Sequence, residues 1–442
     1  MLRFITIPLA VILTSFYFFP VEFSFLPGIN TKMMEAVLGL ILFLFQFARS
    51  DSGFLDNNIA KLAVWALIVS LFGFAAVTVN TTPDFAYAMY FVSAAVWVAG
   101  AYFVVNFIGF AHDRQSPTLV MNYLIAVCVI QCVLAVVIDT NASVRLWVDS
   151  HFLQGQDFLK SNTVRRLYGI GASLDVAGSR FAAVLTMIAF LLVYYSKKLP
   201  DFVGQTSTWL YVISFFAIAV IGNMVARTTL VGVIVALVYL ALNFKYVFVR
   251  ADGRINYLFF WISVFLLLLI PLSIYLYNND AFFHKQIRFA FEGFFNLFEK
   301  GEWEVDSTEK LKTMYVFPDN LKTWLIGDGY FSNPRDTDPY YIGQMSGGYY
   351  MGTDVGYLRF TFYFGVFGTL AFCYFMYQAY LTCADRFPSM KMLFLLILAI
   401  NYIVWFKVST DLFLVFALFI CIEKQTDPVS LDPNKLFRVQ RK

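Results

Sequence analysis

Six arginines and one aspartate lie within long apolar stretches, at their ends or in the loops between them, and their side chains could carry chemistry at a membrane surface. They are Arg165, Arg166, Arg180, Arg227, Arg288, Arg359 and Asp354. Arginine stays charged at every physiological pH and forms two parallel hydrogen bonds to a phosphate, so converging guanidiniums suit a phosphorylated ligand. An ionised aspartate beside them would accept a proton from an attacking hydroxyl. These seven residues form the candidate site.

The arginines also have purely structural explanations. Arg165, Arg166 and Arg227 could anchor helix ends, with the charge in water and the aliphatic stem in lipid. Arg180 lies inside an apolar stretch and could neutralise an internal carboxylate such as Asp175. An arginine at that depth costs about 3 kcal/mol or more, so it needs either a partner or a task.

The remaining three charges have structural explanations as well. Arg288 and Arg359 could be ordinary surface charges. Thr353 or Asp354 is placed to cap the helix that follows, because short oxygen-bearing side chains accept hydrogen bonds from the first backbone N–H groups. Capping and catalysis do not exclude one another, so the base assignment for Asp354 stays open at this point.

The elements that must position these residues are membrane-spanning helices. The 442 residues are 60% hydrophobic and only 14% charged, which excludes a soluble protein. The apolar runs are continuous and do not alternate, so helices are favoured over a β-barrel. We expect an all-α polytopic membrane protein with about twelve transmembrane helices. The expected spans are 4–20, 33–48, 60–79, 84–108, 118–138, 174–195, 206–223, 228–248, 256–277, 355–381, 389–407 and 409–422.

The connections between these spans predict a topology. Alternate loops carry the basic residues, which places them and both termini in the cytoplasm by the positive-inside rule. The chain then divides into helices 1–9 within residues 1–277, a large periplasmic loop at 278–354, helices 10–12 within 355–422 and a basic cytoplasmic tail at 423–442. The N-terminal apolar run lacks a small-residue cleavage site and is expected to be the first span.

The large loop is expected to be partly helical. "FHKQIRFAFEGFFNLFEKGE" has aromatic residues at helical spacing among basic ones, which suits a helix lying on the membrane surface. "DSTEKLKTMYVF" and "PDNLKTWLIGDG" read as two short helices, the second opened by Pro318 and stopped near Gly327. A loop of this length with its own helices is usually functional.

Other chemistries find little support. The 5 cysteines lie in or beside apolar runs and read as small packing residues, and the 3 histidines have no metal-ligand spacing. Asp328, Asp336 and Asp338 are close in sequence and could hold Mg²⁺, but loop solvation explains them more simply. We therefore expect no metal and no cofactor. No basic patch interleaved with aromatic residues is present, which argues against nucleic acid as a partner.

Three stretches together resemble the O-antigen ligase and polymerase superfamily of bacterial membrane glycosyltransferases. "RRLYGIGASLDVAGSRFA" looks like the segment before the middle span, and "ARTTLVGVIVALV" is similar to the family's Ser-Arg-Thr span opening, with Ala226 in place of Ser. "LIGDGYF" followed by "GTDVGYLRFTFYFGVFGTLAF" resembles the end of the large loop and the next span. Ligases carry a His-Asn-x-Tyr-Leu motif there, whereas this chain has Asp354-Val355-Gly356-Tyr357-Leu358, which favours a Wzy-type polymerase.

The resemblance implies an enzyme of the bacterial inner membrane that joins oligosaccharide repeat units linked to undecaprenyl pyrophosphate. Arg166 and Arg227 with Asp354 would then be catalytic, and Arg165, Arg180, Arg288, Tyr357 and Arg359 would bind substrate. The implied partners are the lipid-linked oligosaccharides, membrane lipid, a chain-length regulator and a flippase. Two alternatives stay open: a ligase that moves finished glycan onto lipid A core, and a flippase or other transporter of lipid-linked oligosaccharides.

Overall fold

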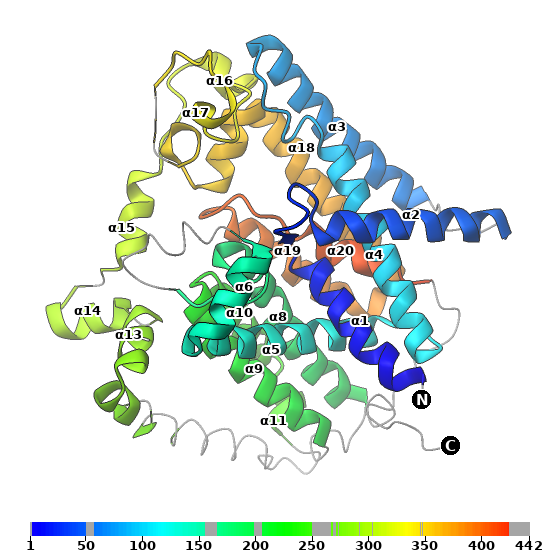
Figure 1. Ribbon diagram of the computed structural model, residues 1–442, viewed down its shortest axis with the longest axis vertical. Coiled ribbons are helices and arrows are strands. Elements are labelled where there is room, and N and C mark those ends of the chain that lie inside the picture. The colour runs from blue at the N-terminus through cyan, green and yellow to red at the C-terminus, as the bar shows by residue number, and fades with distance from the viewer. Residues whose placement is uncertain are drawn as a thin grey trace. The chain divides into compact units, whose positions relative to one another are not determined.

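The computed structural model describes residues 2–49, 57–154, 166–198, 206–249, 267, 271–272, 274–290, 292–302, 304–344, 346 and 348–423. Within these ranges the chain is built of helices (Figure 1). The exception is one two-stranded antiparallel sheet that pairs β1 (Glu22–Phe23) with β2 (Phe152–Leu153). The prediction of an all-α protein is confirmed.

Seven helices of the described chain are long and apolar enough to cross a membrane. They are α2 (Thr31–Arg49), α3 (Asn57–Asn80), α4 (Tyr90–His112), α5 (Pro117–Thr140), α8 (Leu174–Lys198), α9 (Thr206–Val225) and α18 (Gly356–Arg386). Shorter apolar helices are α1 (Leu2–Phe18), α10 (Thr229–Leu242), α19 (Lys391–Val404) and α20 (Phe413–Ile420), and α11 (Phe244–Phe248) follows α10. The span expected at 256–277 lies mostly outside the described residues. The chain is an all-helical membrane protein.

The contacts divide the chain into two compact units. The first comprises residues 1–20, 28–115 and 306–424, and the second comprises 21–27, 116–305 and 425–442. The segment expected to form one periplasmic loop is shared between them. Its helices α13 (Ala281–Ala290) and α14 (Glu292–Lys300) belong to the second unit, whereas α15 (Asp306–Thr313), α16 (Leu321–Leu325), α17 (Pro334–Thr337) and the 3-10 turn η2 (Tyr350–Gly352) belong to the first.

Local capping explains where several helices begin and end. Ser116 accepts a hydrogen bond from the backbone N–H of Leu119 at 3.2 Å, and Pro117 occupies the first turn of α5. The short helix α16 is capped by Asn320, which accepts from the N–H of Thr323 at 2.8 Å. The expectation that Pro318 opens this helix is therefore wrong by about one turn. The helix begins after Asn320, because the amide side chain of Asn320 accepts a hydrogen bond from one of the first backbone N–H groups, which have no partner inside the helix.

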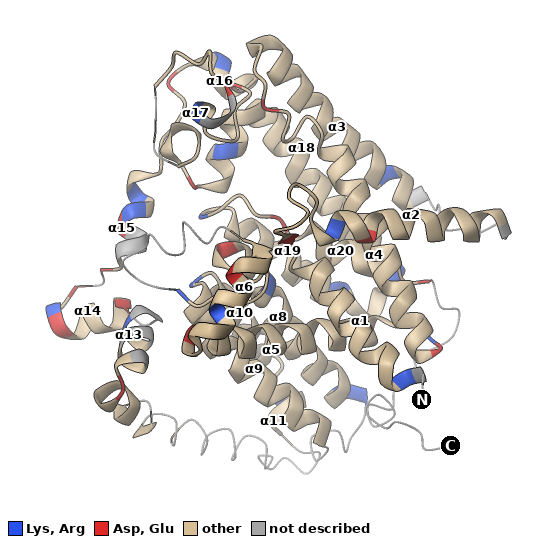
Figure 2. Cartoon of the chain, viewed as in Figure 1, with Lys and Arg blue, Asp and Glu red and all other residues tan. Residues whose placement is uncertain are grey.

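Charged residues are rarer on the helices that could cross a membrane than on the short helices of the large loop (Figure 2). Figure 2 shows Lys, Arg, Asp and Glu sparse along α3 and α18 and more frequent on the segments from α13 to α17. Within the second unit, α8 is almost entirely enclosed by its neighbours. It packs closely on α10, because a methyl group on Gly232 would overlap the backbone of Ala182. Small residues at this crossing allow the two backbones to approach, as is usual between helices in membranes.

Candidate functional site

Arg359, in the first turn of α18, is the centre of a site within the first unit. Only 6% of the residue is exposed. Its guanidinium carbon lies 3.7 Å from the ring centroid of Phe331 and 3.5 Å from that of Tyr349. The same group donates to the hydroxyl of Ser409 at 2.6 Å and to the carbonyl of Phe331 at 3.0 Å. Arg359 is thus held by cation–π contacts and two hydrogen bonds and is not a surface charge.

One donor of that guanidinium is left over. The Nε atom of Arg359 is buried and has no hydrogen-bond partner. Arginine presents five N–H donors in a fixed fork, so the geometry that satisfies its two terminal nitrogens does not also satisfy the third. A buried, unpaired donor costs about 1–3 kcal/mol, and such groups are concentrated at functional sites.

Asp84, which sequence reasoning missed, fixes the chain that holds Arg359. Its carboxylate, 7% exposed, accepts hydrogen bonds from the backbone N–H groups of Phe331 at 2.9 Å and Ser332 at 2.8 Å. The other oxygen accepts from the N–H of Ala86 at 3.1 Å. Because Phe331 supplies both a ring and a carbonyl to Arg359, Asp84 positions the arginine through it. The sequence feature that could have pointed to Asp84 is its position as an acid at the start of the span expected at 84–108.

The helix that carries Arg359 is broken about one and a half turns further on. Phe364 and Gly365 leave the helical region, Gly365 with φ 72° and ψ −178°. The carbonyls freed by the break accept hydrogen bonds from the next segment: Asp328 N–H donates to Phe362 O at 2.6 Å, and Gly329 N–H donates to Tyr363 O at 3.0 Å. The "GDG" sequence of the large loop, residues 327–329, therefore forms a turn whose backbone N–H groups satisfy the carbonyls at the break in α18.

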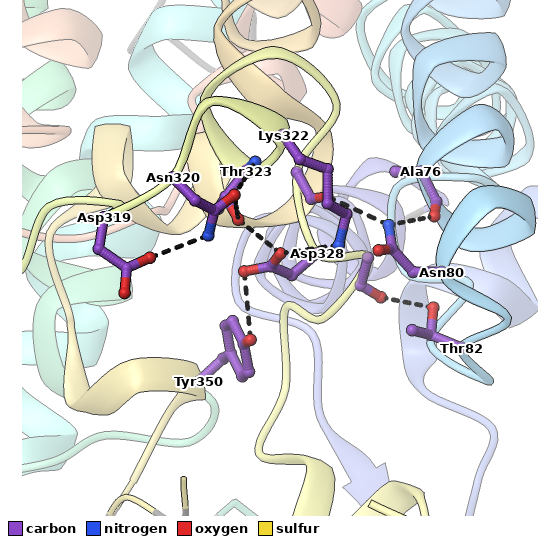
Figure 3. A network of polar contacts seen from close by, with 11 residues as sticks. Ala76, Asn80, Thr82, Asp319, Asn320, Lys322, Thr323, Asp328 and Tyr350 are labelled. Atoms are coloured by element: carbon purple, nitrogen blue, oxygen red, sulfur yellow. Dashed lines mark hydrogen bonds and ion pairs between the residues drawn. The ribbon is translucent and has the colours of Figure 1, made fainter. Parts of the chain in front are cut away.

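Figure 3 shows how side chains tie this turn down. Asn80, at the end of α3, donates to the carbonyl of Gly327 at 3.1 Å, and the Thr82 hydroxyl donates to the carbonyl of Gly329 at 2.9 Å. The Asp328 carboxylate accepts from the hydroxyl of Thr323 at 2.7 Å and from that of Tyr350 at 3.2 Å. These bonds attach the loop segment to α3 as well as to α18.

The tyrosine in this network stays protonated. Burial, followed by the negative charge of Asp328, raises the pKa of Tyr350 well above its ordinary value. Lys322 balances that charge, with its ammonium 3.3 Å from an oxygen of Asp328. The contacts of Asp328 with Thr323, Tyr350 and Lys322 hold the loop in place, and this structural role accounts for an acid at this position.

Asp354 and Tyr357 flank the start of α18. Asp354 is half-buried and interacts electrostatically with the guanidinium of Arg359. The Tyr357 hydroxyl donates to the carbonyl of Tyr402 at 3.1 Å, and its ring packs edge-on against Trp405. The structure therefore brings Asp354 and Arg359 into one site and gives Tyr357 a packing role beside it.

The expected cap of α18 is not formed by a carboxylate. The residue at the N-cap is Val355, and no side chain makes a capping hydrogen bond. The Thr353 hydroxyl accepts from the N–H of Val355 at 3.3 Å, one residue before the helix. The expectation that Thr353 or Asp354 caps the helix is wrong, because the chain turns into the helix one residue later than the sequence suggests.

Arg227 belongs to the second unit, at the corner between α9 and α10. Its guanidinium lies 2.5 Å from a carboxylate oxygen of Glu292 at the start of α14, and the two side chains are 15% and 17% exposed. Next to it, the Thr228 hydroxyl donates to Asp175 at the start of α8. The corner fits tightly, since a methyl group on Gly178 would lie 2.8 Å from the Cβ of Ala226. The methyl group of Ala226 thus packs against a glycine of α8.

The other predicted arginines of the second unit have different surroundings. Arg180 is buried within α8. Arg166 is half-buried and precedes a loop that the Gln131 side chain holds by two hydrogen bonds, both 2.9 Å, to the backbone of Ile170. Arg288 forms an exposed two-pronged ion pair with Glu299, with nitrogen–oxygen distances of 2.9 and 2.6 Å.

The predicted site residues therefore fall into two groups. Asp354, Tyr357 and Arg359 lie in the first unit, whereas Arg166, Arg180, Arg227 and Arg288 lie in the second. Arg165 is outside the described residues. Among the residues that the structure describes, no group of three or more His, Cys, Asp or Glu side chains could hold a metal ion.

The geometry defines an all-helical membrane protein with two charged sites, one in each unit. Comparisons of the chain with protein-family models, with curated proteins and with solved structures return no match. Any narrower function therefore depends on the sites themselves and on the motifs in the sequence.

Proposed function

We propose that the protein is a membrane glycosyltransferase that polymerises oligosaccharide repeat units carried on undecaprenyl pyrophosphate. The observation that supports this best is a half-buried acid, Asp354, that interacts electrostatically with the buried cation Arg359 at the start of α18. A neighbouring positive charge keeps a carboxylate ionised, and an ionised carboxylate can act as a base.

In the proposed reaction, a hydroxyl of the acceptor sugar attacks the anomeric carbon of the donor glycan. The bond from that carbon to the pyrophosphate oxygen breaks, undecaprenyl pyrophosphate leaves, and the hydroxyl proton goes to Asp354. Attack opposite to the leaving group inverts the anomeric carbon. Arg359 is a positioning residue in this scheme, because two aromatic rings lie against its guanidinium and each of its terminal nitrogens already donates a hydrogen bond.

The arginines of the second unit are assigned to the leaving group. Arg166 and Arg227 would stabilise the negative charge of the pyrophosphate, with Arg165, Arg180 and Arg288 as further contacts. Glu292 already neutralises Arg227. A pyrophosphate must therefore displace this carboxylate or bind beside it, which a ligand with several negative charges can do more readily than a monoanion.

The proposal includes a topology. We place about twelve spans in the bacterial inner membrane, with both termini in the cytoplasm and residues 278–354 in the periplasm. In that orientation Asp354 faces the compartment where lipid-linked repeat units are joined.

A transporter of lipid-linked oligosaccharides is the second candidate, because discontinuous membrane helices are typical of transport sites. The break in α18 is the observation that favours it. Its freed carbonyls, however, are occupied by the N–H groups of Asp328 and Gly329 and do not line an open path. This makes the enzyme the better-supported of the two.

The test is the glycan ladder made by Asp354→Asn in a host that lacks the chromosomal gene. The change preserves side-chain size and removes the base, so we expect loss of polymer with an unchanged amount of protein. Asp319→Asn is the matched control, because Asp319 is an exposed acid of the same unit. Normal ladders from Asp354→Asn would refute the assignment of Asp354 as the base. Unpolymerised single repeats from Asp319→Asn would show that the loss of polymer is not specific to Asp354, and would also refute the assignment.

A further inference from the structure

Glu35 is a carboxylic acid within a membrane-spanning helix. It lies in α2, where 3% of the residue is exposed. The opposite face of the helix presents apolar side chains to the outside, among them Val37, Leu40 and Leu44. Glu35 therefore faces the interior of the first unit and not the lipid, and neither of its carboxyl oxygens has a hydrogen-bond partner.

The helix crossing around Glu35 is closely packed. A methyl group on Gly39, one turn further along α2, would overlap the carbonyl of Ala99 in α4. A methyl group on Gly100 would lie 3.2 Å from the ring of Tyr17 and 3.5 Å from the carbonyl of Lys32. The backbones thus approach too closely on both sides of Glu35 for the side chain to leave by a small rotation.

Among the residues that the structure describes, no cation forms an ion pair or a hydrogen bond with this acid. Lys32, three residues earlier on the same helix, places its ammonium 4.2 Å from the ring centroid of Trp97. The titratable side chains of the two helices packed against α2 are Arg3 and Tyr17 on α1, and Tyr90, Tyr102 and His112 on α4. Arg3 pairs with Asp113, Tyr17 donates to the carbonyls of Trp97 and Leu414, and Tyr102 donates to Gln46.

An isolated carboxylate in such surroundings takes up a proton, since burying the unpaired charge costs far more than protonating it. We propose that Glu35 is a proton-binding site of the membrane helices, neutral at pH 7 and able to release its proton only when the α2–α4 crossing opens. This site is separate from Asp354 and does not depend on the proposed glycosyl transfer. It makes the packing of these helices sensitive to pH.

The sign of the pH effect follows from proton counting. Above about pH 4.3 the unfolded chain has lost the proton of this glutamate, while the folded chain keeps it. Unfolding then releases one proton, so the protein loses stability as the pH rises. The unfolding constant of the wild type, divided by that of Glu35→Gln, is expected to rise about tenfold per pH unit. Glutamine mimics the neutral acid and has no proton to lose.

The experiment is reversible unfolding of the full chain in mixed detergent micelles between pH 5 and pH 8 for wild type and Glu35→Gln. Divergence of the two curves with rising pH supports the proposal, and parallel curves overturn it.

Discussion

The break in α18 makes Gly365→Ala the most informative substitution in the first unit. Gly365 has φ 72° and ψ −178°, a backbone conformation that is almost confined to glycine and costs another residue about 1–3 kcal/mol. A methyl group there would overlap the carbonyl of Leu325 and lie 2.7 Å from the nitrogen of Ile326, both at the end of α16. The substitution therefore strains α18 and pushes α16 away at the same time.

The expected magnitude combines the strain with the bonds that the displacement breaks. Moving the turn that follows α16 removes the hydrogen bonds from Asp328 N–H and Gly329 N–H to α18, each worth about 1 kcal/mol. Together with the backbone strain, the free energy of unfolding should fall by about 3–5 kcal/mol. Gly348→Ala is the matched control, because Gly348 has φ +80° but nothing within 4 Å of the added methyl group. It should cost about 1–2 kcal/mol.

Equilibrium unfolding of both variants in mixed micelles measures the difference. Gly327→Ala tests the other side of the contact, since its methyl group would overlap the carbonyl of Tyr363 and lie 2.6 Å from the nitrogen of Phe364. Because both changes disrupt one contact, the double variant should lose less than the sum of the two single losses. A Gly365→Ala protein as stable as Gly348→Ala, or strict additivity with Gly327→Ala, would refute the idea that the turn locks the break.

Two further predictions concern the arginine site and the topology. Arg227→Lys keeps the charge but loses the two-pronged geometry, so polymer should be lost while the protein still folds; Glu292→Gln should leave polymer formation intact. If both variants lose stability but make normal ladders, the role of Arg227 is only to form the ion pair with Glu292, and it does not bind the pyrophosphate. A cysteine introduced at Asn333 should react with an impermeant thiol reagent in intact spheroplasts, and reaction only after lysis would place residues 278–354 in the cytoplasm.

The helices could be predicted from the sequence because each depends on its own residues. The run at 118–138 became α5 at Pro117–Thr140, with its start fixed by Ser116 and Pro117. The short helix α15 was likewise expected from its own polar pattern. The break in α18 could not be predicted this way. "FYFGVFGTL" reads as an ordinary membrane helix with glycine, and the N–H groups that satisfy its freed carbonyls come from residues 328–329.

The site was harder to predict than the fold, because spacing does not reveal which partner a charge will meet. The position of Asp354 near Arg359 was readable, since the two are five residues apart, one just before α18 and the other in its first turn. Asp84 was not, because it binds backbone N–H groups at residues 331 and 332, far along the chain. The same holds for the surroundings of Arg359, because the two aromatic rings that flank its guanidinium are supplied by the large loop.

The partners that the arginines already have limit what they can bind. Arg359 is held by rings and neutral oxygens, so its positive charge is not cancelled by a bonded carboxylate and still acts on Asp354 nearby. Arg227 is different, because Glu292 lies against it in a mostly buried pair. Separating such a pair costs about 3–5 kcal/mol, which a single negative charge on a ligand would barely offset. A pyrophosphate can meet that cost, since it brings more than one charge and several acceptor oxygens. Glu292 would thus act as a filter that admits polyanions to Arg227 and excludes monoanions.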